Sequence, residues 1–119
     1  MAKKILVIDD SRYTRLKIVQ LLQEKGYEVL EAENGNAGLE KAREHNPDCI
    51  ITDLLMPEMD GYQLLENLKK DNSTIPAIVI TADIQETTRE KVLAMGAIDV
   101  INKPADHIKL LELIQATVK

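Results

Sequence analysis

The chain has 119 residues, of which 45% are hydrophobic and 29% are charged, and its formal net charge is -5 at pH 7. This length and composition are typical of a soluble protein, so we expect residues 1–119 to form one domain with a real core. The acidic balance disfavours direct binding to nucleic acid or to an anionic membrane, because such surfaces carry a basic excess.

Two further features indicate a cytoplasmic protein. The apolar runs are much shorter than the roughly 20 residues that span a bilayer, and no signal-peptide core develops at the N-terminal end. The single cysteine, Cys49, lies inside an apolar run and has no partner for an intramolecular disulfide. A buried thiol of this kind suits a reducing compartment.

Short apolar runs alternate with longer stretches of helical spacing along the chain. The first run, KILVID at 4–9, is expected to be a strand, and the helix after it has Ser11 as its N-cap and Gly26 as its stop. In the last helix an apolar stripe is expected to face the core, made of Ile108, Leu111 and Val118 and widened by Leu110, Leu113 and Ile114. The other expected strands are 28–32, 49–53, 77–81 and 99–102.

This alternation predicts an α/β fold with five strands and five helices. Strands that alternate with helices pair in parallel through right-handed crossovers, which leaves a sheet covered on both faces. Near-continuous apolar strands agree with that double burial. The sequence shows no internal repeat and no linker, which favours a single domain.

Polar side chains stand where the predicted strands end: Asp9 and Asp10 after the first, Asp53 after the third, Thr81 after the fourth and Lys103 after the fifth. Ligands of open parallel sheets bind outside the carboxyl ends of the strands, so we expect these groups at one edge. Helix capping explains any one of them, but not three crowded carboxylates that each raise the others' cost of ionising. An open, all-oxygen acidic site suits Mg²⁺.

These residues, in this order, resemble the receiver domains of two-component response regulators, in particular single-domain, CheY-like ones. The resemblance covers the whole chain and rests on VIDDSR, DLLMPEMDG, VITA and GAIDVINKP. It implies a flavodoxin-like, doubly wound sheet with the strand order 2-1-3-4-5. It also implies a signalling protein that catalyses its own phosphorylation and dephosphorylation and is not an enzyme with a separate substrate.

The resemblance assigns roles to the residues at the strand ends. It implies that Asp53 is the phosphoacceptor and that Asp10 binds Mg²⁺ directly, while Asp9 acts mainly through water. Asp53 and the backbone carbonyl of Leu55 would complete the protein ligands of the ion.

The same resemblance gives roles to three residues near the acceptor. Lys103 would pair with the phosphoryl group, Thr81 would donate a hydrogen bond to it, and a cis peptide bond would precede Pro104. Because both Lys103 and Thr81 act on the phosphoryl group, we expect them to matter during or after its arrival and not in holding the fold together.

The implied partners are proteins. A sensor histidine kinase or a phosphotransfer protein would supply the phosphoryl group, and a downstream target would bind the face formed by the fourth helix, the fifth strand and the fifth helix. Many receivers carry Tyr or Phe three residues before the lysine, where this chain has Val100. We therefore expect the response to phosphate mainly in the loop after Thr81 and the fourth helix, around Asp83 to Met95.

Three alternatives remain open. A small-molecule phosphatase could form an aspartyl-phosphate, but haloacid-dehalogenase-like enzymes carry D-x-D-x-T on the first strand, whereas Asp9 and Asp10 are adjacent here. An FMN carrier needs a hydroxyl- and glycine-rich loop after the first strand, where this chain has the acidic DDSRYTR. A pseudo-receiver that is never phosphorylated would not need the complete set of acids and lysine.

Overall fold

The computed structural model describes residues 2–118, which form five strands that alternate with five helices. The elements are β1 (Lys4–Ile8), α1 (Arg12–Glu24), β2 (Glu28–Ala32), α2 (Gly35–His45), β3 (Cys49–Asp53), α3 (Gly61–Lys70), β4 (Ala77–Thr81), α4 (Glu86–Ala94), β5 (Asp99–Asn102) and α5 (His107–Thr117). The predicted α/β alternation is confirmed, with each strand within one residue of its expected bounds.

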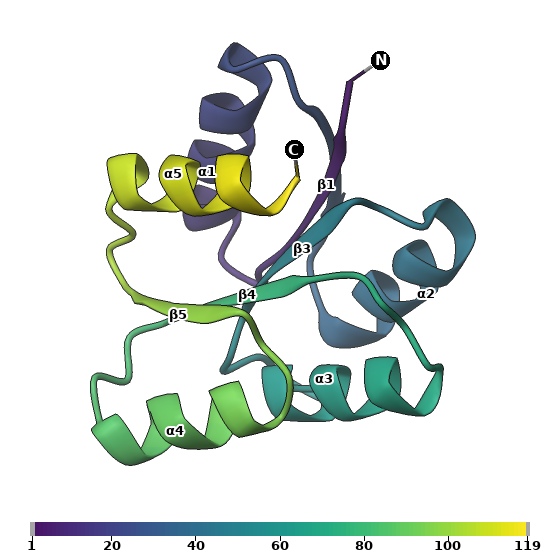
Figure 1. Cartoon of the computed structure of the whole chain (residues 1–119), viewed down its shortest axis with the longest axis vertical. Helices are drawn as coiled ribbons and strands as arrows, with labels where there is room; N and C mark the ends of the chain where they lie inside the picture. The colour runs from purple at the N-terminus through teal and green to yellow at the C-terminus, as the bar shows by residue number, and fades with distance from the viewer. Residues whose placement is uncertain (1, 119) are drawn as a thin grey trace.

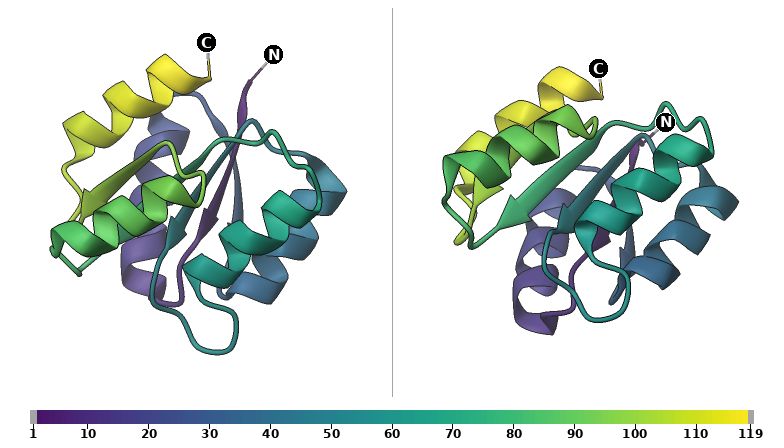
Figure 2. Two further views of the ribbon diagram at one scale, coloured as in Figure 1. Left: turned by 60° about the horizontal axis from the view of Figure 1, so that its bottom comes forward. Right: turned by 90° about the horizontal axis from the view of Figure 1, so that it is seen from below.

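All strand pairs are parallel, and the strands lie in the order β2-β1-β3-β4-β5 (Figure 1). Helices α1 and α5 cover one face of the sheet, and α2, α3 and α4 cover the other (Figures 1 and 2). The predicted flavodoxin-like, doubly wound sheet is therefore confirmed. The chain runs outward from β1 to β2 and then returns past β1 to β3, so the carboxyl ends of β1 and β3 lie next to each other at the point where the winding reverses.

Alternate residues of each strand feed two separate cores. In β1, Leu6 and Ile8 pack with α2 and α3, while Ile5 and Val7 pack with α1 and α5. Successive strand residues point to opposite faces, so a strand that is covered on both sides must be apolar throughout. Cys49 is fully buried in the second core, as its apolar surroundings predicted.

The ends of α1 follow the expected signals, whereas the start of α5 does not. Ser11 caps α1 by accepting the N–H of Thr14, and Gly26 beyond its end adopts a positive φ of 88°. In α5, Leu110 and Ile114 are fully buried, but Ile108 is 71% exposed. The predicted stripe was wrong at Ile108, because two residues of a helix turn through about 200° and so place Ile108 opposite Leu110.

Among residues 2–118, no helix is both long enough and apolar enough to cross a bilayer.

Candidate functional site

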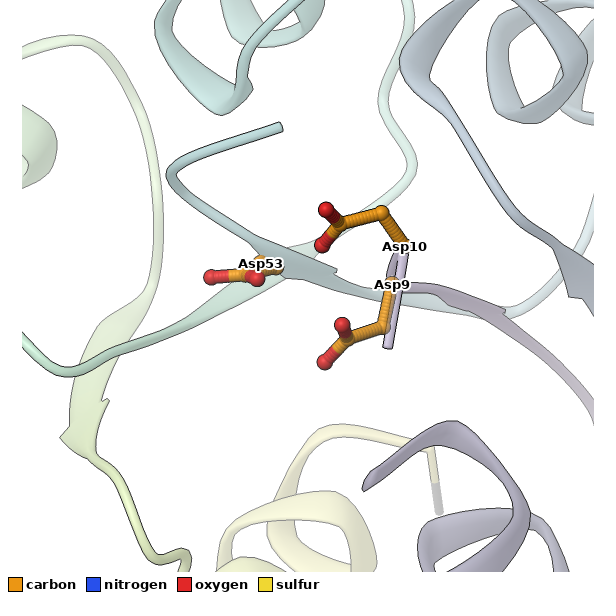
Figure 3. Close-up of side chains that lie close together, drawn as sticks. All are labelled: Asp9, Asp10 and Asp53. Carbon is orange, nitrogen blue, oxygen red and sulfur yellow. The ribbon is translucent and has the colours of Figure 1, made fainter. Parts of the chain in front are cut away.

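Three carboxylates gather at the carboxyl edge of the sheet, where β1 and β3 end side by side. Asp9 and Asp10 follow β1 and Asp53 is the last residue of β3, and one oxygen of each lies within 4.8 Å of the others (Figure 3). Asp9 and Asp53 are buried, at 2% and 7% exposure, while Asp10 is exposed. The predicted convergence of these three acids is confirmed, and Asp10 opens the cluster to water.

Lys103 reaches the two buried acids from the end of β5. Its Nζ lies 3.0 Å from Oδ2 of Asp53 and 3.1 Å from Oδ2 of Asp9. The peptide bond between Lys103 and Pro104 is cis, as the resemblance implied. In the structure without a phosphoryl group, the ammonium group of Lys103 is therefore the counter-charge of both Asp9 and Asp53. Sequence reasoning did not assign this role to Lys103.

The pKa values of this pair reflect opposing effects. Burial raises the pKa of Asp53 and the charge of Asp9 adds to this, while the hydrogen bond from Lys103 only partly offsets the rise. Burial alone would lower the pKa of Lys103, but its hydrogen bonds and charge interactions with Asp53 and Asp9 outweigh burial and leave that pKa above its ordinary value. Lys103 is thus a cation at neutral pH. The raised pKa of Asp53 means that its ionised form is less favourable here than in water.

The backbone and side chain of Asp9 are both held in place. Its Oδ1 accepts the N–H of Ser11 at 2.8 Å, and its carbonyl oxygen accepts a hydrogen bond from Nη1 of Arg15 at 2.7 Å. Within the described part of the chain, the side chain of Asp10 makes no hydrogen bond. One acid of the pair is therefore fixed, and the other has both oxygens available to a ligand.

Thr81 is fully buried at the end of β4, next to β3. Its Oγ1 accepts the N–H of Asp83 at 3.1 Å, and its carbonyl oxygen accepts the N–H of Lys103 at 2.8 Å. Among residues 2–118, the hydroxyl proton of Thr81 has no acceptor. The hydroxyl can therefore donate to a new oxygen at this edge without releasing Asp83.

Asp83 connects this hydroxyl to α4 and β5. Its Oδ2 accepts the hydroxyl of Thr88 in α4 at 2.8 Å, its Oδ1 accepts the N–H of Gln85 at 2.9 Å, and its carbonyl oxygen accepts the amide of Asn102 at 3.1 Å. Sequence reasoning did not single out Thr88 or Asn102. No local signal marks them, because their roles depend on the path of the loop between β4 and α4.

A second polar connection joins α4 to the edge strand at Val100. Val100 is buried, and its carbonyl oxygen accepts a hydrogen bond from Nη1 of Arg89 at 3.0 Å, while Nη2 of Arg89 pairs with Asp99 at 3.0 Å. Only Thr88 and Val92 of α4 are buried. Helix α4 is therefore held to the sheet by few apolar contacts and by this guanidinium.

The loop from β3 to α3 lies close against the end of β3. A Cβ at Gly61 would lie 2.8 Å from Cα of Leu54 and 2.9 Å from the carbonyl oxygen of Asp53, so only glycine fits there. Asp60 caps α3 in a reciprocal pair with Gln63. Leu55, two residues after Asp53, is 61% exposed, and its side chain faces solvent beside the acidic cluster.

Comparison with known proteins gives one consistent result. Residues 5–115 match the model of the family described as response regulator receiver domain. The chain is 39% identical to protein PilH of Pseudomonas aeruginosa, covering 95% of each chain, and 38% identical to the chemotaxis protein CheY of Bacillus subtilis, covering 98% of each. A structure of the CheX–CheY complex of Borrelia burgdorferi with BeF3 and Mg²⁺ has a CheY-like chain that matches with a TM-score of 0.91 at 30% identity, covering 98% of this chain and 90% of that one.

Proposed function

Because the chain belongs to the family of response regulator receiver domains, we propose that Asp53 takes a phosphoryl group from a phosphohistidine and that the chain then signals by protein contact. The observation that carries this proposal is the position of Asp53, a buried carboxylate at a strand end with two further acids and Lys103 within reach. Residues 1–119 would form one such domain. Its compartment would be the cytoplasm, where ATP is the phosphoryl donor of histidine kinases.

The acidic cluster supports Mg²⁺ as the cofactor. Three carboxylates, one of them exposed and free of side-chain hydrogen bonds, are the hard oxygen donors that this ion prefers in a water-rich site. We assign direct binding to Asp10 and Asp53, binding through water to Asp9, and a fourth protein ligand to the backbone carbonyl of Leu55. When bound, Mg²⁺ would offset the repulsion between the acceptor carboxylate and the phosphoryl oxygens.

The chain's own residues then perform the transfer. An oxygen of Asp53 attacks phosphorus in line, a new P–O bond forms, and the P–N bond to the donor histidine breaks, with its electron pair going to the imidazole. Lys103 already lies 3.0 Å from Oδ2 of Asp53, so its ammonium group can follow the charge onto the phosphoryl oxygens. Thr81 donates a hydrogen bond from its hydroxyl group to one of these oxygens.

Thr81 also starts the route by which the signal would leave the site. When the hydroxyl of Thr81 moves toward the phosphoryl group, it pulls Asp83 with it, because it accepts the N–H of Asp83. Asp83 in turn is bonded to Thr88 in the first turn of α4, so the movement reaches that helix. Val100 is stiff and buried and cannot swing as an aromatic ring can. We therefore place the response in residues 83–95 and the output on the face formed by α4, β5 and α5.

Exposed apolar side chains around the acidic cluster support a protein as phosphodonor. Tyr13, Leu55, Ile84 and Ile108 are 60%, 61%, 79% and 71% exposed, and they follow β1, β3, β4 and β5 at the edge that carries the site. A rim of this kind suits a partner's apolar surface, whereas a small phosphorylated metabolite needs enclosing polar groups. The sensor histidine kinase or phosphotransfer protein is therefore favoured over the small-molecule phosphatase alternative.

Phosphotransfer profiling tests this function. Purified histidine kinases of the host are autophosphorylated with radiolabelled ATP and mixed with the chain or with Asp53→Asn. We expect rapid transfer from at least one kinase to the wild-type chain and none to the variant. Equal labelling of Asp53→Asn would refute the assignment of the acceptor, and steady release of phosphate from small phosphomonoesters would instead favour the phosphatase.

A further inference from the structure

Helices α3 and α4 cover the same face of the sheet (Figures 1 and 2). A groove lies between them. It has a volume of about 670 Å³ and is lined by Tyr62, Glu66, Lys69, Lys70, Lys91, Ala94 and Met95. Helix α3 packs closely against α2 on its other side, whereas the seam toward α4 stays open. None of these residues belongs to the phosphorylation site.

A second cavity of about 210 Å³ adjoins this groove and shares Lys69, Ala94 and Met95 with it. Its deeper wall is apolar and includes Leu65 and Leu68, which the core otherwise buries. Because they share three lining residues, the two neighbouring cavities are together called the α3–α4 groove. An apolar side chain could enter its deeper part while the flanking backbone stays in the wider part.

The rim of the α3–α4 groove is basic, although the chain as a whole carries a net charge of -5. Lys69, Lys70 and Lys91 line it against the single acid Glu66, and all four side chains are exposed. Among residues 2–118, none of these three lysines forms a salt bridge. Within the described residues, three lysines without a carboxylate partner therefore line the α3–α4 groove.

One lysine is already positioned over the groove. Nζ of Lys91 lies 4.4 Å from the centre of the Tyr62 ring, which joins α4 to α3 across the opening. The ring gives one face to the ammonium group of Lys91, which is otherwise on the exposed surface. A carboxylate that approached here would meet a cation held in place by the aromatic side chain.

From these features we infer that the α3–α4 groove binds a short acidic segment of a partner protein, with an apolar side chain in the deeper cavity and Asp or Glu side chains against Lys69, Lys70 and Lys91. The apolar cavity favours a peptide over a nucleic acid, whose backbone offers no such anchor. The overall negative charge of the chain also repels a long polyanion, whereas a short acidic segment senses mainly the local lysines.

Selection from a library of random peptides displayed on phage tests this inference with the folded chain as bait. The charge-reversal variant carries Lys69→Glu, Lys70→Glu and Lys91→Glu. Its matched control carries Lys3→Glu, Lys25→Glu and Lys109→Glu, which change the same charge at exposed lysines elsewhere. We expect the wild type and the control to enrich acidic peptides that contain an apolar residue.

A synthetic peptide from the enriched pool is then titrated into each protein. Binding to the charge-reversal variant should be at least about tenfold weaker than to the wild type or the control, and amide shifts in nuclear magnetic resonance spectra should centre on residues 62–70 and 91–96. Two single substitutions test whether the peptide binds in the groove itself. Ala94→Glu, at the junction of the two cavities, should weaken binding, and Ala116→Glu on α5, also exposed, should not.

Several results would overturn the inference: no acidic enrichment, equal binding to the charge-reversal variant, shifts confined to another face, or displacement of the peptide by a DNA oligonucleotide that binds more tightly. Phosphorylation of Asp53 is measured in the double variant Lys69→Glu, Lys70→Glu, whose changes lie in α3 and outside residues 83–95, and it should be unchanged. The proposal that the α3–α4 groove binds a peptide can therefore fail while the proposal that Asp53 is the phosphoacceptor stands. The phosphoacceptor proposal can likewise fail while the groove proposal stands.

Discussion

Lys103→Met probes the electrostatics of the site most directly, because Lys103 is the one side chain among residues 2–118 that forms ion pairs with both buried carboxylates. In the absence of metal, the side chains of Asp9 and Asp53 are only 3% and 9% exposed and share the ammonium group of Lys103. Breaking a buried ion pair costs about 3–5 kcal/mol, since it leaves an uncompensated charge. Because Lys103 is itself 20% exposed and Asp10 opens the cluster to water, we expect a loss of about 2 kcal/mol. The variant should remain folded, but the two ion pairs give Lys103 a part in stability that the sequence-based expectation did not include.

Mg²⁺ should reverse most of that loss. The ion provides positive charge to the same carboxylates, and at a concentration of about 100 times its Kd it stabilises the folded state by about 2.7 kcal/mol. The variant should also bind the ion more tightly than the wild type, because no ammonium group competes for Asp9 and Asp53. The difference in the free energy of unfolding between the two proteins should therefore fall from about 2 kcal/mol in chelator to below about 1 kcal/mol in Mg²⁺.

Urea unfolding followed by far-ultraviolet circular dichroism measures both differences at matched ionic strength. Lys109→Met is the control, because Lys109 is exposed, and among residues 2–118 it forms no salt bridge. Its stability should match that of the wild type in both conditions. Equal stability of Lys103→Met and wild type in chelator, or a difference that Mg²⁺ leaves unchanged, would refute this account of the site.

Four further tests address other parts of the structure. Thr81→Val should still accept phosphate but lose the acceptor of the Asp83 N–H, so hydrogen exchange at that amide should speed up and a phosphate mimic should no longer protect residues 83–95. Gly61→Ala should lower the free energy of unfolding in urea by about 1–3 kcal/mol and slow phosphorylation, because its Cβ would meet the backbone at the end of β3; an unchanged stability would show that the loop can shift without cost. The thiol of Cys49 is fully buried and its pKa is raised from 9.0 to about 12, chiefly by burial, so iodoacetamide at mildly alkaline pH should label it only as fast as the chain unfolds. As pH rises above 9.0 the unfolded thiol ionises first, so the wild type should lose stability relative to Cys49→Ala.

The site was predictable from the sequence because a simple topological rule places it. Strands that alternate with helices are parallel, so the acids after β1 and β3 had to share an edge with the residues that end β4 and β5. The order of the strands came from the family resemblance, since the alternation alone does not fix which strand is central. The fold and the convergence of the three acids therefore needed no three-dimensional information.

Other features depend on details that the pattern does not carry. The pairing of Lys103 with Asp9 and Asp53 in the unphosphorylated state depends on the reach of one flexible side chain. The contacts of Asp83 and Arg89 depend on the path of a loop and the tilt of α4. Ile108 was misplaced because apolar periodicity cannot tell where the first, solvent-facing turn of a helix ends. The α3–α4 groove depends on the spacing between two helices, which no sequence motif specifies.

Intact-protein mass spectrometry after treatment with a small phosphodonor such as acetyl phosphate tests the central claim, that Asp53 is the acceptor in a Mg²⁺-dependent site. The wild-type chain should gain the mass of one phosphoryl group in Mg²⁺ and little in chelator, and the modified peptide should contain Asp53. Asp53→Asn should gain none in either condition, although its fold should be intact. An unchanged yield in Asp53→Asn, or in chelator, would contradict the account.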